Sequence, residues 1–236
     1  MDSTRKTTRV PGILYLLAVL PGPFNFIYVP RTLMVPGDAT ATASHIRASG
    51  TLIRLAIAGE LLSSVLLIFV VLALYRLLRE VDHQHAWAMV ALLLVSIPVS
   101  LLNVLNEIAA LVLVSGADYL AVLEKHQLDA LAYFFLRLHG QGVSVASIFW
   151  GLWLLPFGIL VIRSGFIPRL LGVFLILAGS AYPVHYFTAL FLPQYAHLVS
   201  QFAMVLEAGE FPIVLWLLIK GARLPLDAPV TLPAGG

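Results

Sequence analysis

Six apolar segments constrain this chain more than any other feature of its sequence. A helix needs about 20 apolar residues to cross the roughly 30 Å hydrocarbon core of a bilayer. Six segments meet that length, and they lie at residues 11–30, 51–75, 86–114, 141–162, 168–191 and 197–220. Because unpaired backbone groups are costly in lipid, segments of this kind span membranes as helices. We therefore expect an all-α fold, a polytopic bundle of six transmembrane helices.

The composition supports a membrane-embedded chain. The 236 residues are 60% hydrophobic and 11% charged, which is too little charge to cover the surface of a soluble domain. The 14 Lys and Arg residues lie mostly at the ends of apolar segments, so they indicate membrane topology and not a nucleic-acid partner. The absence of cysteine excludes disulfides, thiolate metal sites and thiol catalysis. The lipid bilayer is thus the expected partner.

The segments between the spans carry further predictions. Residues 39–48 are expected to form a short helix that begins after Asp38. Residues 117–139 alternate apolar and charged positions at helical spacing, which predicts one external amphipathic (interfacial) helix. Gly140 and Gly142 should separate that helix from the next span. The Pro- and Gly-rich sequence at 21–23 should interrupt the first span.

The positive charges predict an orientation. With a cytoplasmic N-terminus, the inner segments hold nine Lys and Arg residues and the outer segments hold five. This difference favours cytoplasmic N- and C-termini. The expected organisation is a basic segment at 1–10, a membrane domain at 11–222 and a disordered cytoplasmic tail at 223–236.

Polar residues within the spans form the candidate site. At 1.5 Å per residue, Glu60 lies roughly 14 Å below the outer start of its span, and Glu107 lies roughly 12 Å below the outer end of its own. Ionisable residues at such depth normally face the bundle interior or a water-filled cavity. We expect one outward-facing polar pocket with two cations, Arg54 and Arg137, near seven further residues: Glu60, Asn103, Glu107, His139, His185, Glu207 and Glu210.

Other interpretations of these residues remain open. Asn103 is as consistent with an interhelical hydrogen bond as with a ligand contact. Arg137 and His139 are equally consistent with a position at the headgroup boundary. Glu60 and Glu210 are the hardest to explain by packing alone, and we expect them to share one site.

Several short motifs resemble those of a bacterial membrane family named domain of unknown function 4386. They are LRLHG at 136–140, IFWGLW at 148–153, RSGFIPR at 163–169 and WLLIKG at 216–221. The segment PGDATATASHIRASGTLIRLAIAGELL, with Arg54 and Glu60, also fits the pattern. The resemblance covers nearly the whole chain and implies a multi-helix protein of the bacterial inner membrane. It implies no catalytic assignment.

Three functional hypotheses follow from the sequence. The first is a protein that binds or transports a small polar or amphipathic ligand, including a lipid, in the outward pocket. It is favoured by prolines within the spans, since discontinuous helices form midplane sites. The second is a membrane-embedded hydrolase, in which His139 and His185 with Glu60, Glu107 or Glu210 would hold zinc. The third is an accessory or sensor subunit. The first hypothesis requires no cofactor.

Overall fold

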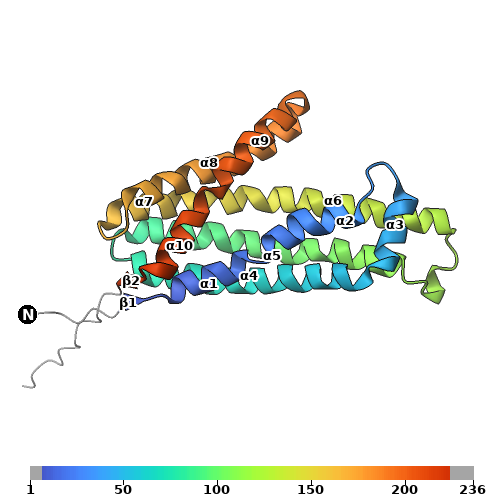
Figure 1. Cartoon of the computed structure of the whole chain (residues 1–236), viewed down its shortest axis with the longest axis horizontal. Helices are drawn as coiled ribbons and strands as arrows, with labels where there is room; N and C mark the ends of the chain where they lie inside the picture. Colours follow the sequence, from blue (N-terminus) through green and yellow to red (C-terminus); the bar gives the residue numbers. More distant parts are fainter. Residues whose placement is uncertain (1–6, 224–236) are drawn as a thin grey trace, which may run out of the picture.

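The structure is a computed structural model that describes residues 7–223, and it consists almost entirely of helices (Figure 1). Six of its helical segments are long and apolar enough to cross a membrane. They are Val10–Leu33, Gly50–Leu78, His83–Leu113, Lys125–Ser164, Arg169–Phe191 and Pro193–Ile219. The predicted all-α bundle of six spans is confirmed.

Three spans are single helices close to the predicted ranges. They are α4 (Gly50–Leu78), α5 (His83–Leu113) and α8 (Arg169–Phe191). The short helix α3 (Ala39–Ala48) has the predicted bounds, and Asp38 caps it by accepting a hydrogen bond of 2.8 Å from the backbone N–H of Ala41. This contact satisfies one of the N–H groups that a helix N-terminus leaves unpaired.

The first span is interrupted where its prolines predicted. It comprises α1 (Val10–Val19), the π-helix η1 (Phe24–Tyr28) and α2 (Val29–Leu33). Proline cannot donate a backbone hydrogen bond, so a sequence with Pro21 and Pro23 does not continue a regular helix. The resulting π-helix orients Asn25 toward α4, where its amide donates to the backbone oxygen of Ala56 at 3.2 Å.

The separate interfacial helix predicted at 117–139 is wrong in its bounds. Residues 118–120 form the short 3-10 helix η2 (Asp118–Leu120), and a new helix, α6 (Lys125–Leu152), begins at Lys125 and runs through Gly140 and Gly142 without a break. The next helix, α7 (Leu154–Ser164), follows after Trp153 and completes the span. Glycine weakens a helix by only about 1 kcal/mol per residue, which packing against neighbouring helices outweighs.

The last span is also composite. It comprises the 3-10 helix η3 (Pro193–Tyr195), α9 (Ala196–Glu207), a second 3-10 helix η4 (Ala208–Glu210) and α10 (Phe211–Ile219). The change of helix type coincides with Pro212 in the first turn of α10. In Figure 1, α9 and the adjoining end of α8 project from the bundle, whereas α10 lies along α1.

The two ends of the described chain meet. The backbone of β1 (Thr7–Thr8) pairs antiparallel with β2 (Ala222–Arg223). Arg163, at the end of α7, contacts Asp82 at the start of α5, with 2.5 Å between the guanidinium nitrogen and the carboxylate oxygen. Figure 1 shows these strands and the loop after α4 at the same end of the bundle. Most of the predicted tail lies outside the described residues.

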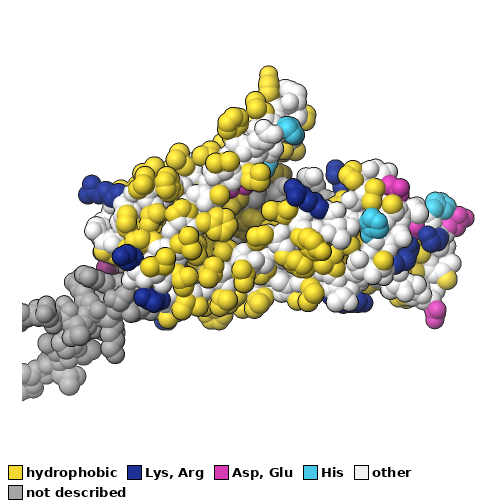
Figure 2. All heavy atoms as spheres, in the orientation of Figure 1, with side chains coloured by type: hydrophobic (Ala, Val, Ile, Leu, Met, Phe, Trp, Pro, Cys, Tyr) yellow, Lys and Arg dark blue, Asp and Glu magenta, His cyan; other side chains and the backbone are white. Residues whose placement is uncertain are grey.

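Charged groups gather at both ends of the molecule, and the side chains between them are mostly apolar (Figure 2). The helix α5 has 31 residues, which corresponds to about 46 Å. This length exceeds a hydrocarbon core of about 30 Å, so part of the bundle extends beyond the membrane. At the end that carries α3, Arg47 and Lys125 both bind the carboxylate of Asp129, whose side chain is 1% exposed.

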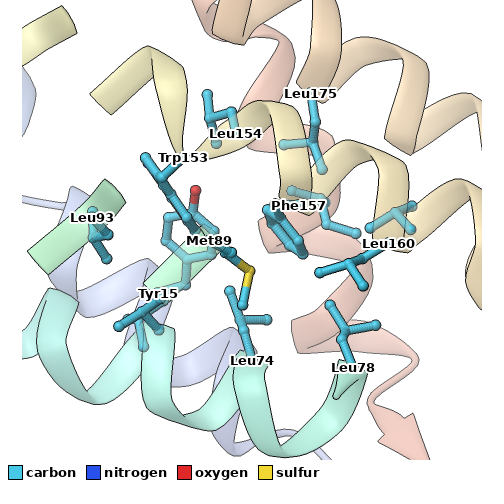
Figure 3. Packing of buried hydrophobic residues seen from close by; sticks show 14 of the residues in the cluster. Tyr15, Leu74, Leu78, Met89, Leu93, Trp153, Leu154, Phe157, Leu160 and Leu175 are labelled. Atoms are coloured by element: carbon cyan, nitrogen blue, oxygen red, sulfur yellow. The ribbon is translucent and has the colours of Figure 1, made fainter. Parts of the chain in front are cut away.

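The core has two apolar clusters along the bundle. The cluster nearer the termini contains Tyr15, Met89, Trp153 and Phe157 (Figure 3), and the rings of Trp153 and Phe157 stack with centroids 5.5 Å apart. The cluster nearer α3 includes Ile53 of α4 and other residues of α2, α3, α5 and α6. On α4 and α5, the buried polar residues lie between the residues that contribute to these two clusters: Glu60, Ser64, Ser96, Asn103 and Glu107.

Candidate metal-binding site in the polar layer

Three ionisable side chains from three helices converge in this polar layer. Glu60 comes from α4, Glu107 from α5 and His139 from α6. The Nε2 atom of His139 lies 3.2 Å from Oε1 of Glu60 and 3.8 Å from Oε1 of Glu107. One ligand atom from each residue lies within 4.8 Å of the other two. We refer to these three residues as the Glu60 cluster.

Two of the carboxylate oxygens in this cluster have no hydrogen-bond partner. They are Oε1 of Glu60 and Oε2 of Glu107, and the two residues are only 8% and 5% exposed. His139 Nε2 lies 3.2 Å from Oε1 of Glu60, but it offers that oxygen no donor when the ring proton is on Nδ1. Buried polar groups in native proteins are almost always satisfied, so these two oxygens require an explanation.

Asn103 fixes the position of His139. The side-chain amide of Asn103 donates to the backbone oxygen of His139 at 2.9 Å. The Nδ1 atom of His139 lies 3.2 Å from that amide nitrogen and 3.4 Å from the backbone oxygen of Asn103. Asn106 lies one turn further along α5 and donates to Oδ1 of Asn103 at 3.0 Å. The face of α5 that carries Asn103 is thus oriented toward α6.

The imidazole of His139 can adopt two tautomers in these surroundings. With a proton on Nδ1, the ring donates toward the backbone oxygen of Asn103, and the lone pair of Nε2 faces the two carboxylates. With a proton on Nε2, the ring faces Glu60 as a donor and accepts at Nδ1 from the amide of Asn103. The first tautomer presents a nitrogen ligand and two oxygen ligands to one point in space.

Gly142 makes the approach of α5 to α6 possible. A Cβ atom at position 142 would lie 1.9 Å from Oδ1 of Asn103, which is far inside van der Waals contact. No other residue type could occupy this position without displacing Asn103. The glycine that was predicted to break the helix instead lets Asn103 reach α6.

A second polar cluster surrounds Glu210. The hydroxyl of Tyr15 donates to Oε2 of Glu210 at 3.1 Å, and Nδ1 of His185 lies 3.2 Å from Oε1 of Glu207. Tyr15 belongs to the apolar cluster nearer the termini, whereas Glu60 lies between the two clusters. The predicted single pocket is therefore divided: Glu60, Asn103, Glu107 and His139 are in one group, and His185, Glu207 and Glu210 are in another.

The two predicted cationic partners belong to neither cluster. Arg54 and Arg137 are exposed, and within residues 7–223 no ion pair joins them to an acid. Their positions on α4 and α6 turn their side chains away from the faces of these helices that carry Glu60 and His139. Arg54 instead lines a cavity of about 230 Å³ near α3, together with Arg47, Gly50 and residues of the α5 C-terminus.

Asn25 is a polar residue of the bundle interior that the sequence did not indicate as a site residue. It is 6% exposed, its Oδ1 has no hydrogen-bond partner, and a Cβ on Gly59 would lie 3.0 Å from its amide nitrogen. Gly59 directly precedes Glu60. The available signal was the motif PGPFNF, an asparagine at an interruption in an apolar span.

A comparison with known protein families identifies the family to which the chain belongs. The family model described as Domain of unknown function (DUF4386) matches residues 10–221. The chain belongs to this family. Its resemblance to that family, inferred from short motifs, is thereby confirmed. No curated protein and no solved structure gives a significant match.

The DUF4386 match includes every residue of both polar clusters. The family description names no activity, and a shared fold does not by itself imply a function. The chemistry of the two clusters is therefore the basis for a functional proposal.

Proposed function

We propose that this protein binds and transports a small ligand that carries positive charge or hydrogen-bond donors, and that the Glu60 cluster is its binding site. One observation carries the proposal. Two carboxylate oxygens, on side chains that are 8% and 5% exposed, have no hydrogen-bond partner in the middle of an apolar bundle. Burying an ionised carboxylate without compensation costs several kcal/mol, and a bound cation or donor would offset that cost.

The proposed location is the bacterial inner membrane, with both termini and the Arg76–His85 loop in the cytoplasm. Support comes from the excess of Lys and Arg in the segments at the end that carries the termini. In this orientation the Glu60 cluster belongs to the outward half of the bundle, because Glu60 is nearer the α3 end of α4 than the Leu78 end. The interrupted first and last spans support transport, since discontinuous transmembrane helices are a recurring feature of transporters.

Ligand-dependent stabilisation of the purified full-length protein tests this proposal. The thermal midpoint would be measured in mild detergent with a panel of organic cations (tetramethylammonium, ethanolamine and putrescine) and divalent metal ions. A ligand at 100 times its Kd stabilises the folded state by about 2.7 kcal/mol. We expect at least one compound to raise the midpoint of the wild type but not of Glu107→Gln. Equal midpoints with and without every compound would contradict the proposal.

A membrane-embedded metal-dependent hydrolase is the second candidate. It is favoured by the donor set, because catalytic zinc sites combine three protein ligands with one open position for water. Glu60, Glu107 and His139 supply three such ligands. Hydrolysis of a chromogenic ester by the zinc-supplemented protein, lost in His139→Gln, would favour this candidate over binding and transport.

A further inference from the structure

We infer that the Glu60 cluster binds one divalent transition-metal ion, with zinc as the representative ion. This inference rests on the proposed function and names the chemical class of its ligand. Three observations carry it, namely the spacing of the three donor atoms, the burial of the unpaired oxygens and the chemistry of the donor set.

The spacing of the donors suits a small metal ion. Zinc binds histidine nitrogen and carboxylate oxygen at about 2.0–2.2 Å, so neighbouring donors in a tetrahedral site lie about 3.4 Å apart. In the Glu60 cluster, the two distances from His139 Nε2 to the carboxylate oxygens are 3.2 and 3.8 Å. All three donor atoms lie within 4.8 Å of one another, so rotation of the two carboxylate side chains could bring them around one ion.

The unpaired oxygens identify what the site lacks. Glu60 Oε1 is unpaired and faces His139, whereas the unpaired oxygen of Glu107 is Oε2, on the same carboxylate as the Oε1 atom that lies 3.8 Å from His139 Nε2. Among residues 7–223, no Lys or Arg forms an ion pair with either carboxylate. Two carboxylates and a neutral imidazole together carry two negative charges, which a divalent ion would neutralise completely.

The donor types narrow the class of ion. Imidazole is a ligand for zinc, iron, nickel and copper, whereas magnesium and calcium prefer sites made of oxygen alone. The chain has no cysteine, so a thiolate site is impossible. Histidines that bind metal usually contact a carbonyl or carboxylate through their second nitrogen. Nδ1 of His139 lies 3.4 Å from the backbone oxygen of Asn103 and 3.2 Å from the Asn103 amide nitrogen, so a metal-bound ring would donate to the former and the amide would have to turn away.

Direct measurement of zinc binding tests the inference. The full-length protein would be purified in mild detergent, stripped with a chelator and titrated with Zn²⁺ against a fluorescent competitor. We expect one zinc ion per chain. Loss of a residue that only hydrogen-bonds to a metal ligand weakens metal affinity by about 10- to 100-fold. Loss of a direct ligand, in Glu107→Gln or His139→Gln, should therefore weaken zinc binding by at least that factor.

Matched variants of the second cluster serve as controls. Glu207→Gln and His185→Gln remove the same chemical groups from the pair that lies 3.2 Å apart on α9 and α8, and they should leave zinc affinity unchanged. X-ray absorption spectroscopy of the zinc-loaded wild type uses no variant, so its result does not depend on whether the variants fold. It should show one imidazole ligand together with oxygen ligands.

Each outcome separates the metal inference from the proposed function. Absence of zinc binding, coordination by more than one histidine, or equal affinity in the wild type and Glu107→Gln would overturn the metal site. If an organic cation nevertheless stabilises the wild type and not Glu107→Gln, the proposed function stands without the metal. If neither zinc nor an organic cation binds, both are wrong.

Discussion

Gly142 of α6 lies against the side chain of Asn103 of α5, so closely that a Cβ atom at position 142 would be 1.9 Å from Oδ1 of Asn103. Asn103 in turn holds the backbone and the ring of His139. The absence of a side chain at one position on α6 thus determines the geometry of the Glu60 cluster.

Gly142→Ala is expected to disturb that geometry. The added methyl group must displace Asn103, and overpacking of this kind costs about 1–3 kcal/mol of folding free energy. Chemical unfolding in detergent micelles measures the loss. Gly140→Ala is the matched control, because a Cβ at position 140 has no atom within 4 Å, and alanine there should be neutral or stabilise by about 0.4–1 kcal/mol. Equal effects of the two substitutions would contradict the close contact.

A double-mutant cycle distinguishes the two polar clusters. Glu60 and Glu107 both face His139, so the effects of Glu60→Gln and Glu107→Gln on unfolding free energy should be non-additive by about 0.5–3 kcal/mol. Glu210 instead accepts a hydrogen bond from Tyr15 in the other cluster. Glu60→Gln and Glu210→Gln should therefore add to within about 0.3–0.5 kcal/mol. Strong coupling between Glu60 and Glu210 would restore the single pocket predicted from the sequence.

Asp82 should make stability depend on acid pH. The pKa of Asp82 is lowered, first by the hydrogen bond from the backbone N–H of His85 and further by the His85 side chain and Arg163, although partial desolvation opposes them. Because its pKa is lowered on folding, ionised Asp82 stabilises the folded state at pH values above about 3.9, the pKa of an aspartate in the unfolded chain. This contribution is lost as the pH falls through the lower, folded-state pKa.

Asp82→Asn isolates that contribution. Asparagine caps a helix as well as aspartate does, so the variant keeps the cap of α5 and loses only the charge. We expect the wild type to have the higher thermal midpoint at pH 6, and the difference to shrink as the pH falls below about 4. A difference that does not change with pH would mean that the charge of Asp82 contributes nothing.

Cysteine labelling tests the orientation, and the natural absence of cysteine makes single-cysteine variants straightforward. An impermeant maleimide should label a cysteine that replaces Lys125 in intact cells, because the Lys125 side chain is 71% exposed at the α3 end. A cysteine at Arg163, which is 54% exposed at the end near the termini, should label only after permeabilisation. The reverse pattern would place the Glu60 cluster in the cytoplasmic half.

The sequence predicts the spans well because their length and apolarity are imposed by the bilayer. It predicts the helix at 117–139 less well for a physical reason. An amphipathic pattern arises whether a helix lies on the membrane surface or packs against other helices. The first half of α6 packs against other helices, as the contact of its Asp129 with Arg47 of α3 shows.

The site was predicted only in part for a related reason. Position along a span gives the depth of Glu60 or Glu210, but it does not give the helix that each side chain faces. That information depends on helix rotation and neighbours, which contacts such as Gly142 with Asn103 determine. The pairing of Tyr15 with Glu210 illustrates this, since these residues are 195 positions apart.

The antiparallel pairing of residues 7–8 with residues 222–223 closes the described chain into a ring. We therefore expect the order of the helices to be cyclically permutable. A short linker could join these two strands, and new ends could be opened between Glu80 and Val81, ahead of the cap at Asp82. All four termini, old and new, would lie at the same end of the bundle, so the permuted chain would keep the same number of membrane crossings and the same orientation. Folding of such a permutant would mean that the bundle depends on which helices are neighbours in space and not on the order in which they are synthesised.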